Sequence, residues 1–326
     1  MTRELTFTEA VREGLAEEMA RDPSVFVVGE GIGARGGNFN TTSGLYERHG
    51  AERLRDTPIT ERGFTGLCTG AAMTGARPVV DYMFFDFALD ALGELLNQTS
   101  KIQYMSDGRL RMPIVLRGCV GVGHAAATHH SGSYYPIFTN IPGFRVAVPT
   151  TPADAKGLLK TAIRSDDPVV FMEHRSLLQT RGPVPDGEHL VPFGRAAIAR
   201  PGSDVTVVGV AVMVPRALAA AEALAREGVS VEVIDPRTVA PLDLDTILES
   251  VHKTGRLLIA DESYAPCGIG AEIAAQVVDR GFDDLDAPIR RLNGLHAPIP
   301  YSPPLEKAVV PDADAVARAI RDLLAE

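Results

Sequence analysis

The chain has 326 residues, and its 42 acidic against 32 basic residues give a formal net charge of −10. This acidic balance argues against nucleic-acid binding as the main activity, because phosphate backbones are bound by clustered positive charge. Cys68, Cys119 and Cys267 lie far apart with no Cys-x-x-Cys pair, which argues against structural zinc and indicates a reducing compartment. The sequence lacks the long apolar run of a membrane span and the apolar core of a signal peptide, so we expect a cytoplasmic protein.

Helices and strands are predicted to alternate through the first half of the chain. Thr6 and Glu9 have capping-box spacing, and apolar residues then recur at helical spacing to about residue 22. The later elements follow in order: strand 25–28, a polar loop to about 44, an extended run ending near 60, a helix rich in Gly and Ala, strand 78–85, helix 89–105, strand 113–116, loop 121–133, strand 144–148, a helix from 151, and strand 169–172.

The same alternation resumes after residue 200. The expected elements are strand 205–209, helix 215–227, strands 231–235 and 257–260, and helices 268–279 and 313–324. The stretch before them is rich in Pro, Gly and charge, which predicts a linker at 181–200. Alternating strands and helices predict an α/β fold of two mainly parallel, doubly wound domains, 1–180 and 201–326.

Glu61 stands where an extended run passes into a helix. Pro58 favours extended backbone at Thr57, and small residues dominate the helix that follows. Aromatic residues at 84–87 and the loop containing His130 also follow predicted strands, and in open parallel sheets ligands bind at the carboxyl ends of strands. Each feature has an ordinary structural explanation: a helix-dipole acid, core aromatics and a surface histidine. Their coincidence at one sheet edge favours a functional site.

Two common types of site are not supported by the sequence. Residues 31–36 match G-x-G-x-x-G after a strand, but residues 37–42 are a poor helix start, which argues against a dinucleotide-binding fold. His130 and Ser131 are adjacent, and neighbours in sequence seldom form a nucleophile–base pair, so a serine hydrolase is not favoured. No P-loop, G-x-S-x-G or H-E-x-x-H motif occurs.

Several longer motifs carry a family resemblance that runs almost from end to end. They are Val28-Gly29-Glu30, Asp56-Thr57-Pro58-Ile59-Thr60-Glu61, Gly70-Ala71-Ala72-Met73-Thr74-Gly75 with Arg77-Pro78, His130-Ser131, Ile141-Pro142-Gly143 and Val233-Ile234-Asp235-Pro236-Arg237-Thr238. With these motifs the chain resembles the β subunits of thiamine-diphosphate-dependent 2-oxo acid dehydrogenases, which decarboxylate substrate in pyruvate, branched-chain and acetoin dehydrogenase complexes. The resemblance implies a transketolase-like pyrimidine-binding domain followed by a transketolase C-terminal domain.

The resemblance also implies roles for individual residues. Glu61 matches the glutamate that hydrogen-bonds the aminopyrimidine N1′ of thiamine diphosphate, and His130 matches a loop histidine thought to assist acyl transfer. These are the expected catalytic residues. The expected cofactor-binding residues besides Glu61 are Glu30, Ile59, Met83 and Phe87, of which Phe87 would stack on the aminopyrimidine.

The usual diphosphate and Mg²⁺ motif, Gly-Asp-Gly followed by Asn-Asn, is missing. The nearest matches are Ser106-Asp107-Gly108 and Pro185-Asp186-Gly187. The resemblance therefore implies that an α subunit holds Mg²⁺ and shares the cofactor, in an α2β2 heterotetramer. It also implies a monovalent cation such as K⁺ on main-chain oxygens around Ile114, Ala162, Ser165 and Asp167.

The predicted function is a β subunit that acts with an α subunit on a 2-oxo acid or acetoin. The acyl group would pass to the lipoyl arm of an acyltransferase core, which the C-terminal domain would dock. Four departures from the family pattern, at Gly31, Asp90, His129 and Gly132, leave the substrate and the acyl acceptor open. Two alternatives are the β half of a split transketolase-like enzyme for sugars or specialised carbonyl ligation, and a non-catalytic docking subunit.

Overall fold

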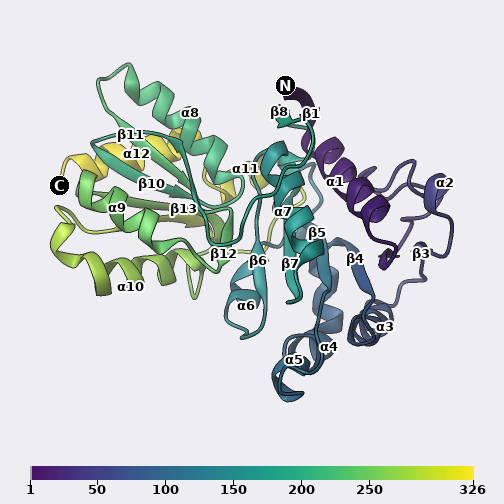
Figure 1. The fold of residues 1–326 in the computed structure, drawn as a ribbon. Coiled ribbons are helices and arrows are strands. Elements are labelled where there is room, and N and C mark those ends of the chain that lie inside the picture. Colours follow the sequence, from purple (N-terminus) through teal and green to yellow (C-terminus); the bar gives the residue numbers. More distant parts are fainter. Residues whose placement is uncertain (1) are drawn as a thin grey trace. The chain divides into compact units, whose positions relative to one another are not determined.

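The computed structural model describes residues 2–326, which form two compact units (Figure 1). The first unit comprises the chain up to Val120 together with Ile137–Phe193, and the second comprises Gly121–Pro136 and Gly194–Glu326. The loop 121–136 therefore groups with the second unit. The sequence-based division into 1–180, a linker at 181–200 and 201–326 stays a prediction; the segment 181–200 contains β8 and β9.

A parallel sheet forms the core of the first unit, with the strand order β6-β7-β5-β4-β2-β3. Its strands are β2 (Val25–Gly29), β3 (Leu54–Asp56), β4 (Arg77–Phe84), β5 (Val115–Val120), β6 (Arg145–Ala147) and β7 (Val169–His174). Every residue of β5 and β7 is buried, as expected of strands covered on both faces. A separate antiparallel pair joins β1 (Thr2–Thr6) to β8 (Arg181–Pro185).

Two long helices of the first unit begin at side-chain caps. The Thr6 hydroxyl accepts from Glu9 N at 3.1 Å, and the Glu9 carboxylate accepts from Thr6 N at 2.7 Å, which is the predicted capping box. Thr151 caps a second helix that carries Pro152 in its first turn. The helices are α1 (Phe7–Arg21), α2 (Tyr46–His49), α3 (Glu61–Met73), α4 (Leu92–Glu94), α5 (Ile102–Met105) and α7 (Pro152–Arg164), with short 3-10 turns η1 (Phe85–Ala91) and η4 (Arg175–Leu177). The short helix α6 (Tyr135–Thr139) has its first two residues in the second unit and the rest in the first.

The prediction of one helix over 89–105 is wrong. The segment is broken into η1, α4, a π-helical turn η2 (Leu95–Thr99) and α5. The buried Thr99 hydroxyl hydrogen-bonds Thr69 at 2.7 Å, and the Ser100 hydroxyl donates to the Leu96 carbonyl at 3.1 Å. Such side-chain bonds compete with helical ones, and Gly93 weakens the helix further, so apolar spacing alone overstated its length.

The second unit contains a five-stranded sheet ordered β14-β13-β10-β11-β9. Only β9 runs antiparallel to its neighbour in this sheet. Figure 1 shows α8 and α12 on one side of the sheet and α9 and α10 on the other. The elements are β9 (Ala197–Arg200), β10 (Val205–Gly209), β11 (Val231–Asp235), β12 (Thr238–Ala240), β13 (Leu257–Tyr264), β14 (Arg290–Gly294), α8 (Met213–Ala225), α9 (Leu244–Thr254), α10 (Ile269–Gly281), η5 (Phe282–Asp284), α11 (Pro303–Val309) and α12 (Ala313–Leu324).

The predicted fold class is confirmed: both units are doubly wound α/β structures with mainly parallel sheets. Among the helices of residues 2–326, none has the length and apolar character that crossing a membrane requires.

Candidate functional site

Glu61 is the first residue of α3, and its side chain is largely buried, with 7% of the residue exposed. The turn before it is held by Thr57 N, which donates to the Gly29 carbonyl at 3.1 Å. Within residues 2–326 no side chain or backbone group donates a hydrogen bond to the Glu61 carboxyl group. A buried acidic group without a donor can accept one from a ligand.

Glu30 follows β2 and lies within the electric field of Glu61. Partial burial raises the pKa of Glu30 above its ordinary value, and the negative charge of Glu61 raises it further by a smaller amount. Because β2 and β3 are adjacent and parallel, the two carboxyl groups come from neighbouring strand ends. The pair is suited to a ligand that brings polar or positively charged atoms.

Met83 and Phe87 come from the end of β4, on the other side of β2. Phe87 is half-buried and packs edge-on against Phe84, with centroids 6.1 Å apart, and Phe39 packs against the same ring at 5.4 Å. Ile59 leaves 82% of its surface exposed. The structure therefore gathers the predicted cofactor-binding residues at the carboxyl ends of β2, β3 and β4, and their role in binding stays a prediction.

The pattern of unsatisfied polar atoms fits the polar edge of a heterocycle. Asn38 Oδ1 and Thr57 Oγ1 are buried and have no hydrogen-bond partner in the described part of the chain. The amide nitrogen of Asn38 contacts Met83 Sδ, which connects one of these atoms to the Met83 side. Buried polar atoms are rarely left unpaired, so these two are suited to a ligand with donors. A flat, apolar-faced and polar-edged ring such as an aminopyrimidine fits this set.

His130 lies in the second unit, at the end of the short helical turn η3 (Thr128–His130). Loop 121–136 is held from within the same unit. Val122 N donates to Glu262 Oε1 at 2.9 Å, Ser133 Oγ donates to the same oxygen at 3.3 Å, and the Tyr135 hydroxyl hydrogen-bonds Asp261. Complete burial raises the pKa of Asp261. The grouping of His130 with Glu61 stays a prediction.

Sequence reasoning did not identify Asp261 and Glu262 as residues that hold this loop. The only signal was a pair of acids directly after the apolar run 257–260, which was predicted to end the strand. In the structure β13 continues through both acids to Tyr264, and both are buried.

Three of the four predicted cation-binding carbonyl oxygens already accept hydrogen bonds. The Ile114 carbonyl accepts from Val169 N at 2.9 Å, the Ala162 carbonyl from Ser165 N at 3.2 Å, and the Ser165 carbonyl from Arg77 Nη1 at 2.9 Å. The Asp167 carboxylate pairs with Arg145 Nη2 at 2.6 Å. Residues 2–326 contain no cluster of His, Cys, Asp and Glu that could hold a metal ion. The monovalent cation, which would use main-chain oxygens, stays a prediction.

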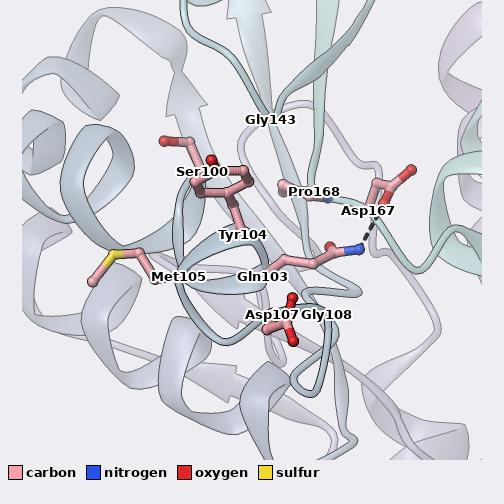
Figure 2. A pocket seen from close by; sticks show the side chains of 9 residues that line it. All are labelled: Ser100, Gln103, Tyr104, Met105, Asp107, Gly108, Gly143, Asp167 and Pro168. Atoms are coloured by element: carbon pink, nitrogen blue, oxygen red, sulfur yellow. Dashed lines mark hydrogen bonds between the residues drawn. The ribbon is translucent and has the colours of Figure 1, made fainter.

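A separate open pocket of about 700 Å³ lies elsewhere in the first unit. Figure 2 shows its lining, where Gln103 Nε2 donates to Asp167 Oδ1 at 3.2 Å. Tyr104 and Met105 stand at its rim with 91% and 67% of their surfaces exposed. The lining residues are Ser100, Gln103, Tyr104, Met105, Asp107, Gly108, Gly143, Asp167 and Pro168, and none is a predicted catalytic residue.

Comparison with known proteins gives matches over nearly the whole chain. Residues 3–181 match the family described as "Transketolase, pyrimidine binding domain", and residues 194–316 match "Transketolase, C-terminal domain". The β subunit of acetoin:2,6-dichlorophenolindophenol oxidoreductase from Cupriavidus necator is 45% identical, with 98% of each chain covered. The pyruvate dehydrogenase E1 component subunit beta of Rickettsia bellii is 43% identical, again with 98% of each chain covered.

A solved structure described as "Split gene transketolase, inactive beta4 tetramer" has the same fold, with a TM-score of 0.80, 22% identity and 98% of each chain covered. The sequence relatives show more than a shared fold, because they are 45% and 43% identical over 98% of both chains, whereas the solved structure is 22% identical. The chain belongs to the transketolase-like family that contains the β subunits of pyruvate dehydrogenase E1 and acetoin oxidoreductase.

Proposed function

We propose that the protein is the β subunit of a thiamine-diphosphate-dependent dehydrogenase that acts on a 2-oxo acid or acetoin. The observation that carries this proposal is the carboxyl group of Glu61, a residue that is 7% exposed. Within residues 2–326 this group accepts no hydrogen bond, and it lies near the carboxyl ends of β2, β3 and β4. The near full-length relatives, one named for pyruvate and one for acetoin, support it.

Each residue of the group has a task that its chemistry allows. Thiamine diphosphate supplies the carbanion chemistry when it is bound. Glu61 would accept a hydrogen bond from, or share a proton with, ring nitrogen N1′. Phe87 and Ile59 would hold the ring by apolar contact, and Met83 and Glu30 would be the other residues around it. His130 would move a proton during transfer of the acyl group.

An α subunit would complete the site and hold Mg²⁺ with the diphosphate, giving an α2β2 assembly. The motif for diphosphate binding is missing from this sequence, and the surface offers large exposed apolar side chains such as Ile59, Leu67, Tyr104 and Met105. The free cysteines suit a reducing, cytoplasmic location.

The lipoyl acyltransferase core would dock on the second unit. A groove of about 820 Å³ runs along α10 and η5, with apolar walls that include Val278, Phe282 and Ile289. Asp279 and Asp286 also line it. Apolar walls that include two carboxylates are suited to a partner segment with basic side chains.

The test is Glu61→Gln in enzyme reconstituted with its α partner. Pyruvate, branched-chain 2-oxo acids and acetoin are each offered with an artificial electron acceptor. Wild-type enzyme is expected to reduce the acceptor with at least one substrate, and Glu61→Gln to lose about 100-fold or more in turnover, as for loss of a group that transfers a proton. Glu47→Gln, an exposed residue of α2, is the control.

Two outcomes would contradict the proposal. Near-normal turnover of Glu61→Gln with cofactor bound would remove Glu61 from the mechanism and favour a docking subunit. Absence of reduction with every substrate, together with ketol transfer between sugars, would favour the split transketolase-like enzyme.

A further inference from the structure

A buried charge cluster crosses three neighbouring strands of the first unit. Arg117 on β5 donates from Nη1 to Asp81 Oδ2 on β4 at 3.1 Å, and from Nη2 to both oxygens of Glu173 on β7 at 2.8 and 2.7 Å. Arg117 and Glu173 are each 1% exposed, and Asp81 is 8% exposed. Buried ion pairs seldom add more stability than apolar packing of the same volume would. The cluster therefore calls for another explanation than stability.

The Asp81 oxygen that Arg117 does not bind suggests such an explanation. Asp81 Oδ1 accepts from the backbone N–H of Met83 at 2.9 Å. Met83 has φ of +66°, and the register of β4 with β5 shifts between Asp81 and Phe84. The strand thus bulges at Met83, and a residue with a long side chain occupies the left-handed region that favours glycine.

Strain of this kind persists only where neighbouring groups enforce it, and it concentrates at ligand sites. Here the enforcing groups form a chain. Glu173 fixes the Arg117 guanidinium with two hydrogen bonds, and Arg117 in turn fixes one oxygen of Asp81. The other oxygen of Asp81 then accepts a hydrogen bond from the Met83 N–H. The result is a bulge that turns Met83 out of the regular alternation of β4, at the strand end where Phe87 follows.

We propose that Asp81 is a positioning residue for the pyrimidine of thiamine diphosphate, because it holds Met83 in the left-handed conformation that presents its side chain to the ring. This inference rests on the proposed function, since it takes Met83 as a cofactor contact. Arg117 and Glu173 act one step behind, by fixing Asp81. None of the three needs to touch the cofactor.

The experiment measures thiamine diphosphate affinity by calorimetry on enzyme reconstituted with its α partner and Mg²⁺. Asp81→Ala is expected to weaken binding about tenfold, as for loss of a buried hydrogen bond that leaves its donor unpaired. Asp81→Asn keeps an oxygen that can accept from the Met83 N–H but sets an amide donor against Arg117 Nη1, so it is expected to recover part of that loss. Glu47→Gln is the matched control, with unchanged affinity expected.

A double-mutant cycle with Met83→Gly separates positioning from general stability. Glycine adopts positive φ without help, so removal of Asp81 is expected to change affinity less than twofold in the Met83→Gly background. The pair Asp81→Ala/Met83→Gly also lacks the strained residue, which keeps the comparison possible if Asp81→Ala alone folds poorly. Equal losses in both backgrounds would overturn the inference.

The remaining outcomes are distinguishable. In one outcome the wild-type enzyme binds thiamine diphosphate, and Asp81→Ala binds it with the same affinity but unfolds at a lower temperature. That outcome would overturn the positioning role and leave the proposed function intact. A reconstituted wild-type enzyme that binds no thiamine diphosphate would overturn the proposed function and this inference with it.

Discussion

The backbone N–H of Val122 donates to Glu262 Oε1 at 2.9 Å, across 140 residues of sequence. Ser133 Oγ donates to the same oxygen, so one carboxylate holds both ends of the histidine loop. The neighbouring Asp261 binds Tyr135, and Thr128 Oγ1 donates to the Ile299 carbonyl at 2.9 Å. Residues from the last third of the chain therefore anchor the loop that carries His130.

Glu262→Ala is predicted to free this loop. Two hydrogen bonds to a buried carboxylate are lost, at about 1–3 kcal/mol each, so hydrogen–deuterium exchange of peptides from 121–133 is expected to rise at least about tenfold. If His130 serves acyl transfer, reduction of an artificial acceptor is retained while transfer to a lipoyl domain falls. Glu222→Ala, on the exposed face of α8, is the control. Unchanged exchange of the loop would refute the anchoring role of Glu262.

Glu188 is predicted to stabilise the chain only above acidic pH. Lys160 Nζ lies 2.8 Å and Arg164 Nη1 lies 2.6 Å from its carboxylate oxygens, and their hydrogen bonds lower the pKa of Glu188 from 4.5 to about 2. A lowered pKa means that the contribution is complete above the unfolded-state pKa near 4.5 and is lost as pH falls towards 2. The urea midpoint of Glu188→Gln should therefore lie below wild type at pH 7 and converge with it near pH 2.

The control for this series is Glu47→Gln, in which no ion pair of the described residues is broken. Its midpoint is expected to follow the wild-type curve at every pH. A constant gap between Glu188→Gln and wild type down to pH 2 would show that the charge of Glu188 is not what stabilises the chain.

Gly29 is predicted to be irreplaceable at the end of β2. A Cβ at this position would lie 2.4 Å from the Asp81 carbonyl oxygen on the adjacent strand β4, so the two strands would have to move apart. Gly29→Ala is expected to lower the free energy of unfolding by about 1–3 kcal/mol, as overpacking in a core does. Gly66→Ala in α3 has open space around its Cβ and is expected to raise it by about 0.5–1 kcal/mol. Chemical denaturation of both variants checks the contrast, and equal effects would contradict it.

Elements with local signals were predictable from the sequence. The bounds of β10, β11 and α12 agree with the structure, and the capping box places the start of α1 correctly, because each depends on short-range spacing. The prediction of one helix over 89–105 was wrong because Thr99 and Ser100 make side-chain hydrogen bonds, which the spacing of apolar residues does not reveal. The location of the candidate site at the carboxyl ends of β2, β3 and β4 was predictable because ligands bind at this edge of open parallel sheets. Asp81 and Glu262 could not be identified, since their partners are set by register and by a contact across 140 residues.

Cys267 is predicted to be the fast-reacting thiol of the isolated chain. Burial raises the pKa of Cys68 to about 12 and that of Cys119 well above its ordinary value, whereas Cys267 is exposed. Because the thiolate is the reactive form, titration with a chromogenic disulfide at pH 8 should give one rapid equivalent, and the other two only after unfolding in denaturant. Cys267→Ser should abolish the rapid phase. A rapid phase that survives this substitution would show that Cys68 or Cys119 becomes accessible in the folded chain, through opening of the first unit where both are buried.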